Sequence, residues 1–431
     1  MSKNKFMVLL VFSFAVLGLA IPDSAEAIPA WARRYNAACT MCHTMYPQLN
    51  SFGYKFRRLG YRTPDEFDKS EEWKLPADEI SKFTNYFSAR GRPRVLYTNS
   101  KEDADNLDFR MFDVTLFYAG PVTRNLGFFF ELPFEPDVDK AFLEVGEIHA
   151  NFGDSDHFFF TRFGQMHQFS RVGAGGLDRP IGLSNARVFE DRINGFRPRH
   201  DGIGVDFGYS ANGVTALIQA TNGIEANGGS VLDNTDPNNN KDLAALLEYV
   251  IPDQEGSLSF LYVYGQAPRP TGLTNVDYNG DGTNDATTTS AIAGAKKTRY
   301  HRLYLFADYT FENLGLKPLV GGGIGFDNQF ISSIGTTSAA LTSAASSKSW
   351  FAFAELDKKI TDNVYALARF DYFDPTMKAE ATGATRKTWY GTGGLVWSWQ
   401  DHLRLAAEYT ANDNKSQKLD HTLFGEAQFN F

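Results

Sequence analysis

The sequence predicts a mainly β protein: a transmembrane β-barrel of about 16 strands, preceded by a small α-helical segment. From about residue 82 onward, stretches of roughly ten residues alternate apolar and polar positions, which is the pattern of strands with one apolar and one polar face. The connections between these stretches alternate between short turns and long loops, and the last stretch ends on Phe431. Together these features are typical of bacterial outer-membrane barrels.

Residues 1–27 are predicted to be a secretory signal peptide. Lys3 and Lys5 form a short basic start, and the run from Phe6 to Ala20 is apolar and uncharged. Ala25-Glu-Ala27 then has the small-x-small pattern of a cleavage site. The apolar run of about 15 residues is short for a membrane-spanning helix. We therefore expect export from the cytoplasm, with the outer membrane as the destination.

Residues 28–81 carry the motif Cys39-Thr-Met-Cys42-His43. C-x-x-C-H is the attachment signature of a c-type haem, whose iron is coordinated by the histidine. The chain has only two cysteines, too few for a thiolate zinc site. The alternative is a disulfide or a thioredoxin-like redox pair, but no βαβ pattern follows the motif. We predict one covalent haem c held by Cys39, Cys42 and His43, the last as proximal iron ligand.

The segment 28–81 is predicted to form short helices. One of them is an amphipathic helix from His43 to Tyr61, because its apolar residues recur three or four positions apart. These residues are Met45, Leu49, Phe52, Phe56 and Leu59. A segment of this size is too small for an ordinary core. We expect it to need the haem and a surrounding wall, and therefore to lie in or against the mouth of the barrel.

The barrel is predicted to occupy residues 82–431. Its strands are expected near 82–97, 107–119, 126–134, 142–152, 157–168, 202–210, 213–222, 242–251, 257–265, 299–311, 318–327, 349–357, 363–373, 387–399, 402–410 and 421–431. An even strand count that begins on the short-turn side places both ends of the barrel in the periplasm.

Inward positions of the predicted strands carry many charges. Arg90, Arg92 and Arg94 share one face of the first strand, and we expect them to hold haem propionates or acids of the N-terminal segment through bidentate pairs. The loop 169–201 contains more apolar residues than a solvated loop needs. We predict that this loop folds into the lumen.

The second axial ligand of the haem is left open by the sequence. Met111, Met166 and His149 are candidates because they have inward parity, and His167 is one step off that parity. Each is also acceptable as an ordinary wall residue.

A second metal site is predicted within the loop 266–298. Oxygen-bearing residues alternate there and are followed by glycine, as at the start of a calcium loop. They are Asp277, Asn279, Asp281, Thr283 and Asp285. The acid expected at the twelfth position is replaced by Thr288. The alternatives are Ca²⁺ binding in a shortened loop and an Asn/Asp/Gly-rich surface turn.

The formal net charge of -9 gives no support to nucleic-acid binding. Lipid of the outer membrane is the expected environment. Acidic stretches such as Glu102 to Asp105 and Glu135 to Asp139 lie in predicted outer loops, where their field would attract an extracellular metal ion.

Several motifs together resemble a known family. They are the signal peptide, Ile28-Pro-Ala-Trp-Ala-Arg-Arg-Tyr35, the Cys39–His43 motif, Tyr46-Pro-Gln-Leu-Asn-Ser-Phe-Gly53 and Phe56-Arg-Arg-Leu-Gly-Tyr61. The chain is similar to the fused monohaem c-type cytochrome–porins of bacterial outer membranes, which include iron-oxidising outer-membrane cytochromes. The barrel resembles that family in architecture more than in residues.

The resemblance implies a function in electron transfer across the outer membrane. An extracellular donor such as Fe(II) would pass electrons to a periplasmic cytochrome or another carrier, which would make the chain an Fe(II) oxidase of cytochrome type. Only Cys39, Cys42 and His43 carry over from the family. Two alternatives remain: an outward conduit to extracellular acceptors, and a diffusion porin whose haem segment is a sensor or adaptor.

Overall fold

The computed structural model describes a set of ranges that covers most of the chain. They are residues 30–69, 85–99, 106–134, 143–167, 181–186, 201–222, 241–251, 256–267, 273–276, 286–288, 298–331, 344–374, 388–399, 403–413 and 419–430. The proposed signal peptide lies outside these residues. No helix in the described ranges is long and apolar enough to cross a membrane.

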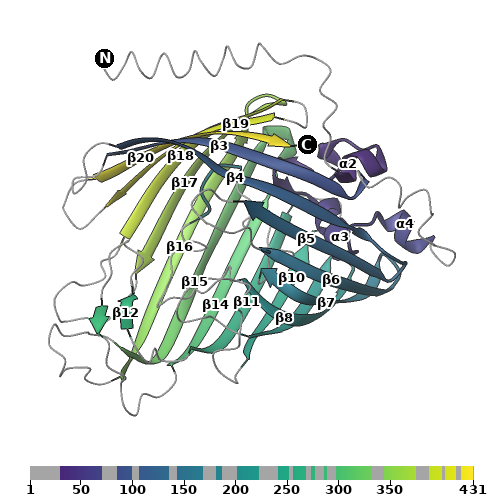
Figure 1. Ribbon diagram of the computed structural model, residues 1–431, viewed down its shortest axis with the longest axis horizontal. Helices are drawn as coiled ribbons and strands as arrows, with labels where there is room; N and C mark the ends of the chain where they lie inside the picture. Colours follow the sequence, from purple (N-terminus) through teal and green to yellow (C-terminus); the bar gives the residue numbers. More distant parts are fainter. Residues whose placement is uncertain are drawn as a thin grey trace.

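Sixteen antiparallel strands form one closed barrel (Figure 1), as predicted. They are β3 (Phe87–Asn99), β4 (Asn106–Pro121), β5 (Leu126–Phe134), β6 (Val145–Gly153), β7 (His157–His167), β8 (Asp201–Ala211), β9 (Val214–Thr221), β10 (Asp242–Val250), β11 (Gly256–Ala267), β14 (Thr298–Tyr309), β15 (Leu316–Ile331), β16 (Ala344–Lys359), β17 (Val364–Asp374), β18 (Thr388–Trp399), β19 (Leu403–Asp413) and β20 (Leu419–Asn430). The first strand closes on the last, with Thr98 opposite Thr422. Closure leaves no unpaired sheet edge, as a strand structure in lipid requires.

The barrel turns apolar side chains outward and polar ones into its lumen. Along β10, buried positions alternate with more exposed ones from Asp242 to Val250. The exposed apolar side chains of the outer face include Ile148, Phe159, Phe163, Phe207, Ile218, Leu247, Leu305 and Phe370. This outer surface is that of a membrane-spanning barrel.

One strand departs from the parity that the sequence indicates. Arg92 of β3 lies opposite Asp113 of β4, but the next residue, Pro93, lies opposite Met111. The extra residue is Phe112, which faces the lumen and lies under the Arg94 guanidinium at 3.7 Å from its ring centroid. A bulge of this kind reverses the faces of the residues beyond it. Met111 therefore faces outward, and its predicted inward position is wrong.

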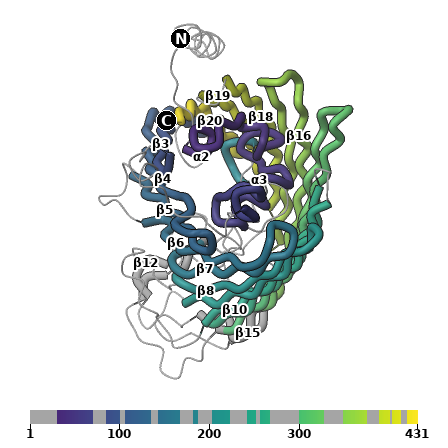
Figure 2. Tube along the Cα trace, turned by 90° about the vertical axis from the view of Figure 1, so that its right-hand side faces the viewer, coloured from purple at the N-terminus to yellow at the C-terminus, as the bar shows by residue number. Residues whose placement is uncertain are grey.

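The N-terminal segment lies inside the short-turn mouth of the barrel (Figure 2). It comprises α2 (Ala30–Tyr35), the 3₁₀ turn η1 (Cys39–Met41), the hairpin β1 (His43–Met45) and β2 (Gln48–Leu49), α3 (Ser51–Arg58) and α4 (Pro64–Asp68). Lys55 pairs with Asp156 at 2.9 Å, and Asp68 accepts from the Ser155 backbone at 2.7 Å. Both partners belong to the short turn between β6 and β7. The predicted place of the segment is confirmed. The helix predicted from His43 is wrong in its first part, because residues 43–49 form the hairpin β1–β2 and the helix begins only at Ser51.

Part of the loop between β7 and β8 also enters the lumen. Its described residues are 181–186, and Ile181 is completely buried. Ile181 belongs to the same buried cluster as Met45 of the N-terminal segment and Leu367 of the wall. The inward fold predicted for this loop is confirmed for these residues.

Three buried charged side chains of the wall hold this loop, and we call Arg369, Arg404 and Glu408 the latch. Arg404 donates to the Gly182 carbonyl at 2.7 Å, and Arg369 donates to the Ser184 carbonyl at 2.9 Å. Glu408 accepts from the Ser184 backbone at 3.2 Å. A side chain at Gly182 would place Cβ 2.4 Å from Glu408 Oε2 and 2.6 Å from Leu367 Cδ2, so the ends of both side chains would have to move to make room for it.

Candidate functional site

The two cysteines are presented by a short turn that is fastened to the next helix. Cys39 begins η1, and the Asn50 amide donates to the carbonyls of Thr40 at 3.3 Å and Met41 at 3.1 Å. The Asn50 side chain also caps α3 by accepting from Gly53 N at 2.9 Å. Capping satisfies a backbone donor that a helix start leaves unpaired. One residue thus fixes the orientation of α3 against the cysteine turn.

Gly53 lets α3 approach this turn more closely than any other residue would. A Cβ at this position would lie 2.3 Å from the Cys42 carbonyl oxygen and 2.9 Å from Leu49 Cδ2. Real atoms do not approach to that distance, and the nearer atom is backbone. The glycine that weakens the helix by propensity is therefore required by the packing around Cys42.

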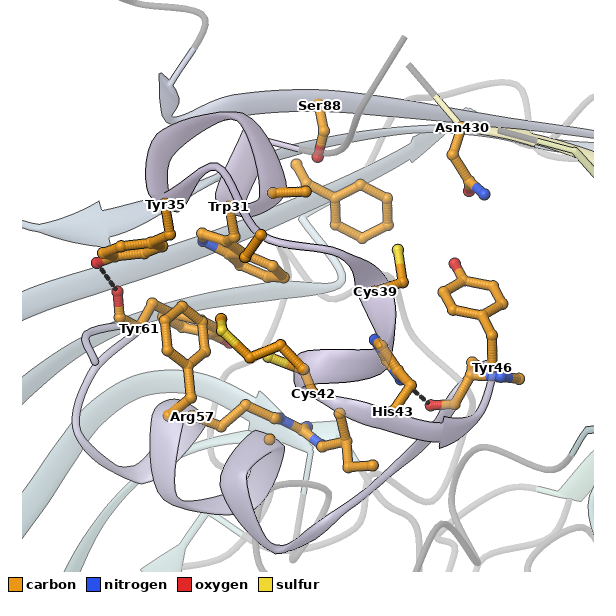
Figure 3. Close-up of a pocket in the computed structure, with 18 of the residues that line it drawn as sticks. Trp31, Tyr35, Cys39, Cys42, His43, Tyr46, Arg57, Tyr61, Ser88 and Asn430 are labelled. Atoms are coloured by element: carbon orange, nitrogen blue, oxygen red, sulfur yellow. Dashed lines mark hydrogen bonds between the residues drawn. The ribbon is translucent and has the colours of Figure 1, made fainter. Parts of the chain in front are cut away.

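A large cavity opens beside Cys39, Cys42 and His43 (Figure 3), with an empty volume of about 1320 Å³ including its open mouth. One side is formed by the N-terminal segment. The other is formed by the barrel wall, including Ser88, Phe117, Phe129, Val145 and Asn430. The lining is predominantly apolar, as is usual for a site that takes a large organic cofactor.

Aromatic side chains form the end of the cavity remote from Cys39. The Trp31 ring stacks on Tyr61 with centroids 4.7 Å apart and planes 7° apart, and Tyr61 stacks on Phe129 of the wall at 5.3 Å. Phe56 meets Trp31 edge to face at 6.0 Å. These pairs exclude water from the cavity wall and join the segment to the barrel.

The ring of His43 lies at the edge of the cavity (Figure 3). Its Nδ1 is 3.1 Å from the Pro47 carbonyl oxygen and 3.2 Å from that of Gln48. A carbonyl can only accept, so Nδ1 carries the proton and donates it. Histidines that bind metals commonly use one ring nitrogen in this way, which assigns the metal to the other. The arrangement therefore fits iron coordination by Nε2.

Cys42 is poorly suited to react as a free thiol near neutral pH. Burial raises the pKa of the Cys42 thiol to about 11. The thiolate is the reactive form in disulfide exchange, and a raised pKa makes it scarce near neutral pH. No disulfide joins Cys39 and Cys42.

A haem c fits the residues that surround the cavity. Two cysteines and a histidine with its Nδ1 already engaged stand at one side, and apolar and aromatic groups cover most of the remainder. Arg57 of α3 and Arg90 of β3 also line the cavity, and guanidinium groups are the usual partners of carboxylates such as propionates. The wall and the segment would thus hold the group between them.

The three inward arginines of β3 pair mainly with acids of neighbouring strands. Arg90 and Arg92 donate to Asp113 at 2.9 and 2.6 Å, and Arg94 donates to Glu426 at 2.5 Å. The expectation that they bind acids of the N-terminal segment is wrong, because the wall places acids opposite them. Of the three, Arg90 is the one that lines the cavity.

The candidates for a second axial ligand do not line the cavity where their side chains are described. Met166 is buried and accepts from the Gln219 amide at 3.1 Å. His149 lies 3.1 Å from Glu147 and is behind Tyr61, with ring centroids 5.8 Å apart. Met111 faces outward, and the His167 side chain lies outside the described residues.

The proposed calcium loop, Asp277 to Asp285, and the acidic outer loops also lie outside the described residues. The strands on either side of the calcium sequence, β12 (Leu273–Val276) and β13 (Ala286–Thr288), pair as a short hairpin. The described part of the chain contains no cluster of three acidic, histidine or cysteine side chains that would hold a metal ion.

Sequence reasoning did not identify several residues that shape the site. Tyr61 has a left-handed backbone (φ 63°) that follows Gly60 (φ 69°), and this turn directs its ring to the cavity. The local signal was the Gly-Tyr pair after α3. Arg57, in contrast, looked like any basic residue of a helix end.

The chain shares its fold with solved porins. An anion-selective porin from Comamonas acidovorans aligns with a TM-score of 0.55 and 11% identity over 80% of this chain and 98% of the porin. The outer membrane channel DcaP of Acinetobacter baumannii aligns with a TM-score of 0.53 and 13% identity over 80% and 96%. Salmonella typhi OmpF, solved with daunomycin, aligns with a TM-score of 0.51 and 9% identity over 80% and 97%. No family model and no curated protein matches the chain.

Proposed function

We propose that this chain is an outer-membrane electron carrier in which one haem c, attached at Cys39 and Cys42, sits in the periplasmic mouth of a porin-like barrel. The observation that carries the proposal is the cavity: the three residues of the attachment motif meet an apolar space closed by the barrel wall. The fold and the apolar outer face support an outer-membrane location.

The residues of the chain have separate tasks in this proposal. The haem, when bound, supplies a one-electron couple. His43 donates its Nδ1 proton to backbone carbonyls and would hold the iron through Nε2. Trp31, Tyr61 and Phe129 exclude water from one side of the cavity. Electrons would pass between an extracellular donor such as Fe(II) and a periplasmic cytochrome or other carrier at the short-turn side.

Haem attachment is tested first. Denaturing gels stained for haem peroxidase should show a band that is lost in Cys42→Ala and retained in Thr40→Ala, a matched change at an exposed residue between the cysteines. Haem that acidic acetone extracts from the wild-type protein would overturn covalent attachment.

The donor is tested separately. Oxidised protein mixed with Fe(II) without oxygen should give the spectrum of reduced haem. If Fe(II) leaves the haem oxidised while a low-potential reductant reduces it, outward electron transfer to extracellular acceptors becomes the better account.

The second candidate function is a diffusion porin with a haem-bearing sensor or adaptor, which the fold of its structural neighbours favours. The N-terminal segment and residues 181–186 both occupy the lumen, and this favours a poorly conducting barrel. The ion conductance of the protein in planar bilayers distinguishes the two candidate functions. A large open-pore conductance of the intact protein would support the diffusion porin.

A further inference from the structure

Two hydrogen bonds in series connect His43 to the barrel wall. The ring Nδ1 lies 3.2 Å from the backbone oxygen of Gln48. The side-chain amide of the same Gln48 donates to Asp357 of β16 at 2.5 Å. Gln48 and Asp357 are both completely buried. The Pro47 carbonyl also lies 3.1 Å from Nδ1. One of the two carbonyls that accept from His43 therefore belongs to a residue whose side chain is fastened to the wall.

The local structure makes this fastening necessary. β2 contains only Gln48 and Leu49, and its pairing with β1 has an irregular register. A two-stranded hairpin is marginally stable by itself, so the position of the Gln48 carbonyl depends on outside contacts. Asp357 provides a contact from a rigid strand of the barrel.

Two charged groups of the wall interact with Asp357 and also have partners of their own. Lys317 of β15 lies opposite Asp357 in the sheet, and its ammonium is 3.3 Å from Asp308 of β14. Glu355, on the same face of β16, pairs with Arg369 at 3.0 Å. Gln48 is thus the group of the N-terminal segment that Asp357 holds.

We propose that Gln48 is a positioning residue for the axial histidine, and that Asp357 acts through it. This inference rests on the haem proposed above. An acceptor that binds the second ring nitrogen of a ligating histidine fixes its orientation and raises its basicity. A more basic ligand stabilises the oxidised iron. The Gln48–Asp357 contact would therefore hold the reduction potential of the haem lower than the segment alone would set it.

The test uses the full-length protein and spectroelectrochemical titration of the haem. Gln48→Leu removes the side-chain contact but keeps the backbone carbonyl and leaves Asp357 in place. We expect the equilibrium constant for haem reduction to rise about tenfold, which is about 59 mV for a one-electron couple. Asp357→Asn keeps an oxygen that accepts from Gln48 and should shift the potential much less. Gln48→Asn, whose amide is too short to reach, should behave like Gln48→Leu and serves if that variant does not fold.

The matched control lies elsewhere in the same contact surface. Arg58 of α3 and Glu248 of β10 also form a buried pair between the segment and the wall, but neither is hydrogen-bonded to His43 or to its acceptors in the described structure. Glu248→Gln should therefore leave the potential unchanged.

Each outcome is decisive. An unchanged potential in Gln48→Leu, with covalent haem present, overturns the inference and leaves the proposed function intact. An equal shift in Glu248→Gln would show loosening of the whole segment. An equal shift in Asp357→Asn would show that the acid group of Asp357, and not its contact with Gln48, sets the potential. Either result overturns the inference. A wild-type protein without covalent haem would overturn the proposed function itself.

Discussion

The latch should decide whether residues 181–186 stay in the lumen, and Glu408→Ala removes its acceptor. Glu408 receives hydrogen bonds from Leu183 N at 2.8 Å, from Ser184 N at 3.2 Å and from the Ser184 hydroxyl. A hydrogen bond to a charged group contributes about 1.5–3 kcal/mol. Lumen water and the two arginines of the latch replace part of the interaction that Glu408→Ala removes. We therefore expect the free energy that holds residues 181–186 in the lumen to fall by about 3 kcal/mol in total. The population of molecules in which residues 181–186 have left the lumen should then rise on the order of 100-fold.

Hydrogen exchange measured by mass spectrometry in nanodiscs reads this population directly, because exchange at a protected amide follows local opening. The amides of residues 183 and 184 should lose protection by the same factor. The control is Asp206→Ala, which removes a buried acid paired with Arg162 on the other side of the barrel and does not touch residues 181–186. Unchanged protection in Glu408→Ala would refute the reasoning, and so would an equal loss in Asp206→Ala.

Three further predictions concern the cysteine turn and the orientation of the barrel. Gly53→Ala should destabilise the segment by about 1–3 kcal/mol through overpacking against Cys42 and lower the yield of haem-bearing protein on stained gels; a normal yield would contradict the close approach. In protein made without haem, Cys42 should alkylate appreciably only as the pH nears its raised pKa of about 11, because the thiolate is the reactive form; fast alkylation at pH 8 would contradict its burial. An epitope near Asn239, in the connection between β9 and β10, should be accessible to antibody on intact cells, whereas one at Asp253, between β10 and β11, should not. The reverse labelling would show that the barrel has the opposite orientation in the membrane.

The sequence was sufficient to predict the barrel strands, because contact with lipid on one face makes apolar and polar residues alternate within each strand. Every predicted strand corresponds to an observed one, with differences at the ends. Parity failed at Met111, since a bulge depends on how β4 pairs with β3 and leaves no mark in the β4 sequence alone. The inward direction of Arg94 was visible, but its partner was not. Glu426 lies on the last strand and meets Arg94 only because the barrel closes.

The candidate site also has residues that the sequence identifies and residues that only the fold brings together. Cys39, Cys42 and His43 are chemically identifiable from five consecutive residues, because attachment of a haem requires those groups at that spacing. The cavity beside them depends on which wall residues the closed sheet brings to the mouth. Asp357 is 309 residues from Gln48, and no local pattern links the two. The sequence by itself determined the strands and carries the motif on which the proposed haem attachment rests. Only the tertiary structure decided what surrounds the histidine, since those contacts come from strands far apart along the chain.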